Sequence, residues 1–457
     1  MRVPRVEKEV GIEVYTTKTP GIGGTIKRFL EDFIVEEILV NGFKAEIQRR
    51  ENFPLGPPPS REPYLLCVLI KRGKDTILTL KSVARQLGIS WDHIQIAGIK
   101  DTKALTAQHV TLKGVSAEDL QTVSIKGVEI YPIGYFYQKI SPYHLLGNHF
   151  QVVIRDVNHS KSTIEKRVAK IIEELHSIGG IPNFFGHQRF GTIRPITHLV
   201  GKAIIKGNFE KATMLFLAKS TPNEHPNLRQ ARKNLWVTRD FKQALKEFPK
   251  RFHYERIMLK HLAKNPTDFI GAFRRLPKKL LSLFPQAYQS YLFNKFLSAR
   301  IALGIGLNKA EVGDYVVKVE PSGLPATNIN ETACDATLSE INEAIKAGKK
   351  RLALPLVGFK QQLSKGIQGE IEKKVLDEEG ISLESFRVKG MPELSMKGGL
   401  RTALTPLNNF QLNEITKDST NPSKMEIKVS FMLHRGSYAT IFLREVMKNR
   451  NPVKSGF

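Results

Sequence analysis

Residues 94–112 have the sequence IQIAGIKDTKALTAQHVTL, and the first part of the chain is built on the pattern that they show. Ile94 to Ala97 is a short apolar run that predicts a strand, and Gln108 to Leu112 predicts another. The glycine-containing turn between them holds Asp101. Such a turn can fix a carboxylate over the end of a sheet, as catalysis requires, although an Asp in this setting more often caps a turn or a helix.

The sequence on either side of this stretch has the pattern of an α+β domain. Strands are expected at 62–71 (EPYLLCVLIK) and 150–155, and helices at 76–88, which stops at a glycine, and at 162–176, whose apolar residues share one face. Strand composition returns at 427–433 and is followed by a helix at 438–448. The first and last parts of the chain therefore have the same character.

Between about 183 and 400 the pattern changes to helices with basic clusters, and it includes a turn-rich loop at 321–330. We therefore expect one α+β domain made of residues 1–182 and 401–457, with a second domain, residues 183–400, inserted into it. Residues 55–60 (LGPPPS) are expected to form an exposed loop and not a domain boundary.

The chain is strongly basic. Its 457 residues include 70 Lys and Arg against 44 Asp and Glu, which gives a formal net charge of +26 at pH 7. A nucleic acid is the first candidate for a partner that compensates this charge, and an anionic membrane surface is the second. Growth at high temperature also enriches Lys and Arg, so the charge alone does not decide between these readings.

Cysteine usage and hydropathy predict a cytoplasmic protein. The chain has two cysteines, Cys67 and Cys334, which are far apart and match no metal-ligand spacing, so a disulfide framework is not expected. The sequence shows no signal peptide and no apolar run long enough to cross a bilayer. We therefore expect a soluble protein in a reducing cytosol.

Two patches combine aromatic side chains with amide and basic ones. Residues 182–191 (PNFFGHQRFG) could stack on bases and bind phosphates through Gln188 and Arg189, although most of the Phe rings are expected to anchor a core. In residues 147–150 (GNHF), Phe150 could stack on a flipped base and Asn148 could orient a carboxylate, or the patch is a turn that leads to a core Phe.

Two other patches are weaker signals. Residues 431–440 (FMLHRGSYAT) predict a strand-to-helix turn, which could place helix N–H groups near a phosphate or serve only as a turn. Lys27 could pair with a buried carboxylate elsewhere, or it is an ordinary surface lysine. The sequence has no P-loop and no dinucleotide-binding glycine motif, and its 12 histidines show no metal-ligand spacing, so no metal site is expected.

Taken in order, five segments resemble the TruD family of tRNA pseudouridine synthases. They are AGIKDTKALTAQ (97–108), GNHF (147–150), PNFFGHQRFG (182–191), QAYQSYLFN (286–294) and GSYATIFLRE (436–445). The resemblance implies a pseudouridine-synthase fold with a central, mainly antiparallel sheet and an inserted α+β TRUD domain. His434 departs from the family's usual Pro, and Phe184 from its usual Tyr; the basic composition is similar to that of archaeal members.

The resemblance also implies a function and a site. The chain is expected to isomerise a uridine of tRNA, at position 13, to pseudouridine, with Asp101 as the catalytic nucleophile or base and with no cofactor. Lys27 matches a lysine near that aspartate, Phe150 lies against the target base, and Asn148 lies beside it. The residues expected to contact the substrate are Lys27, Phe33, Lys100, Asn148, Phe150, Gln188 and Arg189. We expect a monomer that binds tRNA.

Three other functions are compatible with parts of the pattern. A non-catalytic RNA-binding or tRNA-folding protein on the same scaffold would keep the charge and the aromatics but would not need Asp101. A metal-assisted RNA nuclease would need a carboxylate or histidine cluster, which the sequence does not show. A ribosomal or membrane-surface protein would use the positive charge alone.

Overall fold

The computed structural model describes residues 2–48 and 64–457, and within them the largest sheet has eight strands. In spatial order these are β13 (Asn408–Asp418), β14 (Asn421–His434), β6 (Leu145–Val157), β1 (Phe33–Leu39), β4 (Leu105–Lys113), β2 (Tyr64–Arg72) and β5 (Val128–Phe136), with β3 (Ile94–Ile96) beside β4. The β1–β4 pair is parallel and the other pairs are antiparallel. The predicted mainly antiparallel sheet is confirmed.

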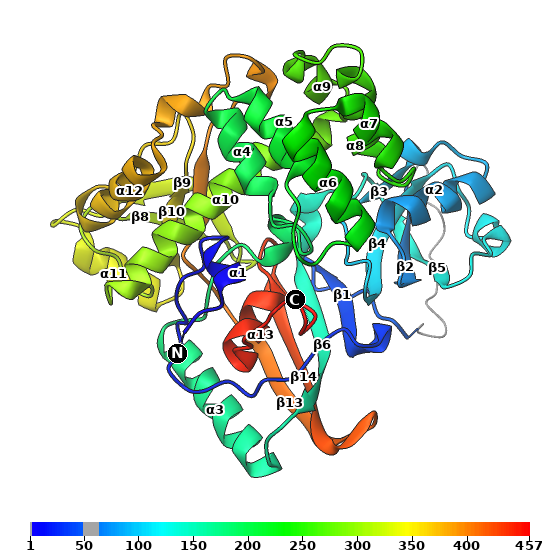
Figure 1. Ribbon diagram of the computed structural model, residues 1–457. Helices are drawn as coiled ribbons and strands as arrows, with labels where there is room; N and C mark the ends of the chain where they lie inside the picture. Colours follow the sequence, from blue (N-terminus) through cyan, green and yellow to red (C-terminus); the bar gives the residue numbers. More distant parts are fainter. Residues whose placement is uncertain (1, 49–63) are drawn as a thin grey trace.

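The sheet joins strands from opposite ends of the chain. Figure 1 shows β13 and β14, near the red end of the colour bar, beside the cyan β6. Phe431 of β14 lies opposite Phe150 of β6, and Phe150 lies opposite Val35 of β1. Val35 in turn lies opposite Thr106 of β4. Residues that are far apart in sequence therefore form one row across the sheet.

Three helices pack on this sheet, and their boundaries follow local signals. They are α2 (Thr76–Gln86), α3 (Lys161–Ser177) and α13 (Ala439–Met447). The Asp75 carboxylate caps α2 by accepting from the Leu78 N–H, and the expected C-terminal glycine, Gly88, has a φ of 65°. The predicted apolar face of α3 is buried against the core.

Residues between β7 (Ile181–Pro182) and β12 (Leu404–Thr405) form a second, mostly helical part. β7 and β12 pair antiparallel, so the chain leaves and returns at the same place. The helices are α4 (Thr197–Ile205), α5 (Phe209–Ala218), α6 (Pro226–Thr238), α7 (Phe241–Glu247), α8 (His253–Leu262), α9 (Phe269–Arg274), α10 (Lys278–Ala302), α11 (Leu338–Lys346) and α12 (Gly366–Glu379).

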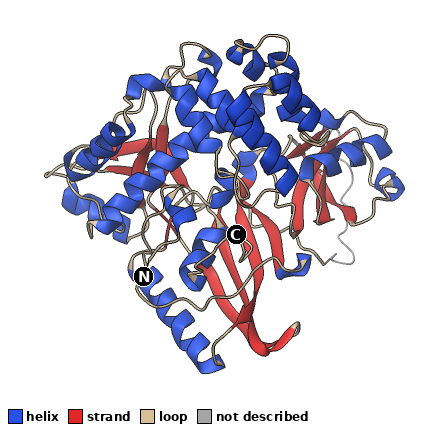
Figure 2. Ribbon diagram, viewed as in Figure 1, coloured by secondary structure: helices blue, strands red, loops and turns tan. Residues whose placement is uncertain are grey.

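A small sheet completes this part. Its strands are β11 (Gly399–Thr402), β10 (Lys350–Leu356), β8 (Tyr315–Val319) and β9 (Pro325–Thr332), in spatial order. Figure 2 shows this sheet and the large one as separate groups of strands with helices between and above them. The long helix α10 lies in the core, and α4 packs so closely on it that a Cβ on Gly201 would come within 2.0 Å of the Phe284 carbonyl oxygen.

Short helices occupy several connections. They are α1 (Arg5–Lys8) and the 3-10 helices η1 (Leu30–Asp32), η2 (Trp91–His93), η3 (Asp119–Thr122), η4 (Pro142–His144), η5 (His187–Arg189), η6 (Leu383–Phe386) and η7 (Pro392–Leu394). None of the helices in the described part of the chain is both long enough and apolar enough to cross a lipid bilayer.

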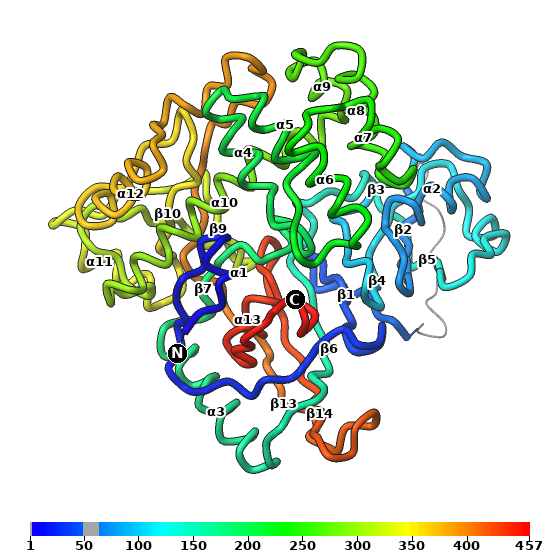
Figure 3. Tube along the Cα trace, in the orientation of Figure 1, coloured from blue at the N-terminus to red at the C-terminus, as the bar shows by residue number. Residues whose placement is uncertain are grey.

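The N-terminal segment lies along the C-terminal helix. Figure 3 shows the blue start of the chain passing the red α13 before it reaches β1. Ile22 donates its backbone N–H to the Val446 carbonyl at 3.0 Å, and the buried Glu7 carboxylate pairs with Arg444 at 2.7 Å. This packing holds the segment that leads to Thr25, which forms a bridge with Arg155 of β6, and to Lys27.

One sequence prediction of local structure was wrong, one alternative that the sequence left open is decided by the structure, and a further prediction lies outside the described residues. The stretch 321–330, expected to be a loop, contains most of β9, because its polar residues form an exposed strand that pairs with β8. Residues 147–149 lie within β6 and not in a turn; β6 passes so close to β14 that a Cβ on Gly147 would come within 2.1 Å of the Leu433 carbonyl oxygen. The expected loop at 55–60 falls among the residues that are not described.

Candidate active site

Asp101 lies on the loop between β3 and β4, and buried polar side chains hold its backbone. The buried Lys71 ammonium donates to the Asp101 carbonyl at 2.7 Å and lies 3.5 Å from the Lys100 carbonyl. Thr76, at the start of α2, accepts from the Lys100 N–H at 3.2 Å and donates to the Lys100 carbonyl at 3.3 Å. The Asp101 carboxylate itself accepts no hydrogen bond from any described residue. The loop is thus fixed through its backbone and not through the Asp101 side chain.

Lys27 lies beside this carboxylate, as the sequence predicted. Its Nζ is 3.7 Å from Asp101 Oδ2, and the Lys27 side chain is 10% exposed whereas that of Asp101 is 36% exposed. The ammonium also lies over the Phe33 ring, 4.3 Å from its centroid. The ring thus holds the Lys27 ammonium in place beside the carboxylate.

The backbone that presents Lys27 is itself strongly anchored. Lys27 has a φ of 59°, a left-handed conformation that costs a non-glycine residue about 1–2 kcal/mol. Thr25, two residues earlier, pairs with Arg155 of β6. The Arg155 guanidinium binds Asp32 at 2.8 Å and also pairs with Glu426. This buried ion network stabilises the turn and offsets its strain.

A buried charge pair lies under the loop that contains Asp101. Lys100 Nζ is 2.7 Å from Glu37 Oε1 and donates to Asn148 Oδ1 at 2.6 Å. The other Glu37 oxygen accepts from the His109 backbone N–H at 2.8 Å. Burial would raise the pKa of Glu37, but the Lys100 charge and the contacts with His109 outweigh it and lower that pKa below its usual value. Asn148 therefore orients Lys100, the neighbour of Asp101, and not Asp101 directly.

Three phenylalanines form an aromatic floor beside Lys27. Phe150 stacks on Phe431 with ring centroids 5.3 Å apart, and it meets Phe33 edge to face at 6.0 Å. Phe150 is only 7% exposed and Phe33 1%. The three rings come from β6, β14 and β1, so the pairing of these strands brings them together.

Gln188 and Arg189 lie in the short helix η5, and neither contacts Asp101 among the described residues. Gln188 is exposed. The Arg189 guanidinium donates to Ser290 Oγ at 3.2 Å and to Gln286 Oε1 at 3.1 Å, so it ties its loop to α10. The structure therefore gives Arg189 neutral partners in the second, helical part of the molecule.

The structure adds residues that the sequence reasoning had not singled out. The loop that contains Asp101 is held from below by Lys71, by Thr76 and, through Lys100, by Glu37. Phe431 completes the aromatic floor. A lysine at the end of an apolar strand and a pair of glutamates within another strand were visible signals of buried charge. Their partners could not be read from the sequence, because each lies on a different element.

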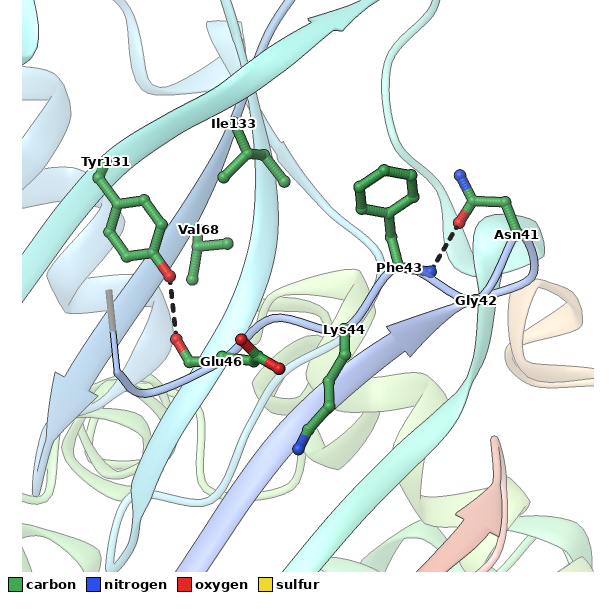
Figure 4. Close-up of a pocket in the computed structure, with 8 residues that line it drawn as sticks. All are labelled: Asn41, Gly42, Phe43, Lys44, Glu46, Val68, Tyr131 and Ile133. Carbon is green, nitrogen blue, oxygen red and sulfur yellow. Dashed lines mark hydrogen bonds between the residues drawn. The ribbon is translucent and has the colours of Figure 1, made fainter. Parts of the chain in front are cut away.

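A separate hollow lies on the opposite face of the sheet. Figure 4 shows this pocket of about 330 Å³, lined by Asn41, Gly42, Phe43, Lys44, Glu46, Val68, Tyr131 and Ile133. Val68 points to the opposite face of β2 from Lys71, because successive side chains of a strand alternate. This pocket is therefore not part of the Asp101 site. Within the described residues, no three His, Cys, Asp or Glu side chains are grouped so that they could hold a metal ion.

Comparison with known proteins gives a consistent set of relatives. The model of the family "tRNA pseudouridine synthase D (TruD)" matches residues 9–446. The chain is 40% identical to a probable tRNA pseudouridine synthase D of Methanosarcina barkeri and 41% identical to that of Methanosarcina acetivorans, each alignment covering 98% of both chains. It is similar to the crystal structure of the putative tRNA pseudouridine synthase D from Methanosarcina mazei, with a TM-score of 0.83 and 39% identity over 99% of this chain and 100% of that one.

Proposed function

The chain belongs to the tRNA pseudouridine synthase D (TruD) family, and from this premise we propose how it isomerises uridine to pseudouridine in tRNA. The reaction breaks the N1–C1′ bond, turns the uracil and forms a bond through C5. Substrate and product are isomers, so the reaction consumes no redox equivalent and no energy source. Family membership favours this enzyme over a non-catalytic RNA-binding protein on the same scaffold.

Asp101 is the catalytic residue of this proposal. Its carboxylate is partly exposed, it faces Lys27 at 3.7 Å, and its backbone is fixed by Lys71. As a nucleophile it would attack C1′, and as a base it would remove the C2′ proton; in both routes the Lys27 ammonium would lie beside the carboxylate. The observation that supports the proposal best is this carboxylate, whose loop is held through its backbone by Lys71 and which lies beside the Lys27 ammonium.

The neighbouring side chains have supporting roles. Phe150, with Phe33 and Phe431 behind it, would contact the uracil after the uridine leaves its stack, a step that costs a few kcal/mol. Lys100 and Asn148 are positioning residues, since their mutual hydrogen bond at 2.6 Å and the Glu37 pair lie beneath the loop. Gln188 and Arg189 would contact tRNA outside the reacting centre.

Further parts of the proposal rest on the family resemblance. We place the target at tRNA position 13, the enzyme in the cytoplasm, and the working form as a monomer. We also assign residues 1–182 and 401–457 to the catalytic domain and residues 183–400 to the family's inserted domain. The β7–β12 pair, where the chain leaves and returns, supports this division.

Release of tritium from uracil C5 tests the reaction. The protein would be incubated with an unmodified tRNA transcript carrying tritium at C5, because formation of the C5 glycosidic bond must expel that hydrogen. We expect release with wild type and none with Asp101→Asn, which keeps the size of the side chain. The matched control is Asp156→Asn, at an exposed residue with a φ of 56° that Asn also tolerates. Equal release by wild type and Asp101→Asn would refute the catalytic assignment.

A further inference from the structure

Residues 449–457, which follow α13, form a compact series of turns. Ser455 donates its backbone N–H to the Pro452 carbonyl at 3.0 Å, and Phe457 donates to the same carbonyl at 3.1 Å. Pro452 and Phe457 are buried, and the Phe457 side chain belongs to the main hydrophobic core. The segment is therefore packed as part of the fold, and Figure 1 marks its end with C beside α13.

This segment lies along the residues that lead to Lys27. Asn449 Nδ2 donates to the Gly24 carbonyl at 3.1 Å. The Ile26 N–H donates to the Ser455 carbonyl at 3.0 Å. Because Ile26 directly precedes Lys27, the segment is hydrogen-bonded to the backbone on which the Lys27 turn begins.

Gly456 makes the closest approach between the two stretches of chain. Its φ is 91°, in the left-handed region that favours glycine. A Cβ on Gly456 would come within 2.1 Å of the Ile26 carbonyl oxygen and 3.0 Å of the Ile26 carbonyl carbon. This carbonyl belongs to the peptide group that joins Ile26 to Lys27, so the absence of a side chain at Gly456 lets the segment lie directly against that group.

The segment also contacts the loop that contains η5. The Phe457 ring meets the His187 ring edge to face, with ring centroids 6.5 Å apart. His187 is 6% exposed, and neither of its ring nitrogens has a hydrogen-bond partner among the described residues. The imidazole therefore serves here as a packing surface for Phe457. The segment thus connects the second, helical part of the molecule to the Lys27 turn.

The Lys27 turn needs support from more than one side. Lys27 has a left-handed φ of 59°, and its side chain is only 10% exposed. From the β6 side, Thr25 and Arg155 exchange two backbone hydrogen bonds of 2.8 Å each. That pair fixes Thr25, whereas the segment fixes Ile26, the residue between Thr25 and Lys27.

We propose that residues 449–457 are a positioning element of the active site, which holds the Lys27 backbone so that the Lys27 ammonium stays beside Asp101. Gly456 and Phe457 are its positioning residues, since one lies against the peptide group before Lys27 and the other anchors the segment in the core. A misplacement of about 1 Å at a reacting centre can cost about a hundredfold in rate. This inference rests on the proposed function, in which Lys27 lies beside the reacting carboxylate.

Gly456→Ala tests this role. The added Cβ forces the two stretches of backbone apart by about 1 Å, because real Cβ atoms do not come closer than 3.0 Å to such a carbonyl. We expect single-turnover tritium release at saturating tRNA to slow about tenfold to a hundredfold while Kd for tRNA is unchanged. The matched control is Gly304→Ala, at a glycine with a φ of 73° where a Cβ would meet no atom within 4 Å. Equal rates for the two variants, or a loss confined to Kd, would overturn the inference.

Phe457 supplies a second pair of variants that add no collision. Phe457→Ala removes the ring that anchors the segment, so it is expected to slow tritium release at saturating tRNA. Phe457→Leu keeps an apolar side chain and is expected to restore most of the rate. Urea midpoints would show that each variant is folded under the assay conditions. A wild-type rate for Phe457→Ala, or no recovery with Phe457→Leu, would contradict the positioning role.

A crystal structure of the slow variant separates this role from a general loss of order. The distance from Lys27 Nζ to Asp101 Oδ2 is expected to exceed the present 3.7 Å, while Lys71 keeps its hydrogen bond to the Asp101 carbonyl. An unchanged distance between Lys27 and Asp101 in a slow variant would overturn the inference. Absence of tritium release by wild type, together with the expected displacement of Lys27, would refute the proposed function and leave the positioning of Lys27 standing.

Discussion

The buried pair beneath the catalytic loop gives a quantitative prediction. We expect Glu37→Gln to reduce the free energy of unfolding by about 3–5 kcal/mol, because breaking a buried pair leaves an uncompensated charge. Lys100 would keep only the Asn148 oxygen, at 2.6 Å, as a partner among the described residues. Glutamine preserves the size of the side chain and one oxygen for the His109 N–H, which Glu37 now accepts at 2.8 Å. The loss of stability should therefore measure the cost of the unpaired Lys100 ammonium and not the cost of a cavity.

A double-mutant cycle isolates the coupling energy between Glu37 and Lys100. Lys100→Met alone should also cost about 3–5 kcal/mol, because it strands the fully buried Glu37 carboxylate. The double variant contains neither charge and should lose less than about 2 kcal/mol, since an apolar replacement of a buried pair is often nearly neutral. Urea unfolding of the four proteins at pH 7 gives the coupling energy. If the stability losses of the two single variants added up to the loss of the double variant within about 0.5 kcal/mol, the reasoning would be refuted, because independent sites behave in that way.

The same cycle separates stability from function. The double variant should recover stability while it releases tritium slowly, because the hydrogen bond between Lys100 and Asn148 would be lost and the catalytic loop would be less well positioned. Recovery of full activity together with stability would show that the pair serves folding alone.

Three other changes have defined outcomes. Lys71→Met removes the donor to the Asp101 carbonyl at 2.7 Å, so single-turnover tritium release should slow about tenfold or more while tRNA binding persists; an unchanged rate would contradict the anchoring role. Gly147→Ala would place a Cβ 2.1 Å from the carbonyl oxygen of the facing strand, so the urea midpoint should fall by an amount worth about 1–3 kcal/mol. Burial, and then Arg444, lowers the pKa of His187 from 6.5 to about 4, so below pH 6.5 the unfolded chain binds a proton that the folded chain does not. His187 should therefore contribute a loss of stability of up to about 1.4 kcal/mol per pH unit as pH drops from 6.5 to 4, and His187→Asn should reduce the slope by that amount in urea titrations.

Local elements could be predicted well because their signals are local. The α3 helix appears within one residue of the predicted 162–176, since its apolar spacing and the Ser160 cap are contained in the segment itself. The strand β9 was missed because an exposed edge strand has no apolar alternation to reveal it. The conformation of residues 147–149 stayed open from the sequence, because it depends on close pairing with β14, which lies at the other end of the chain.

The sequence by itself determined the chemistry that was available: Asp101 in a glycine-containing turn after a strand, the charge of +26, and the order of motifs that identifies the family. Only the tertiary structure decided which groups meet. It placed Lys27 3.7 Å from Asp101 and put Lys71 and Glu37 beneath the loop. The physical reason is that periodicity reports which face of an element is buried, whereas ion pairs and hydrogen bonds act over a few ångströms between elements whose separation in sequence sets no distance in space.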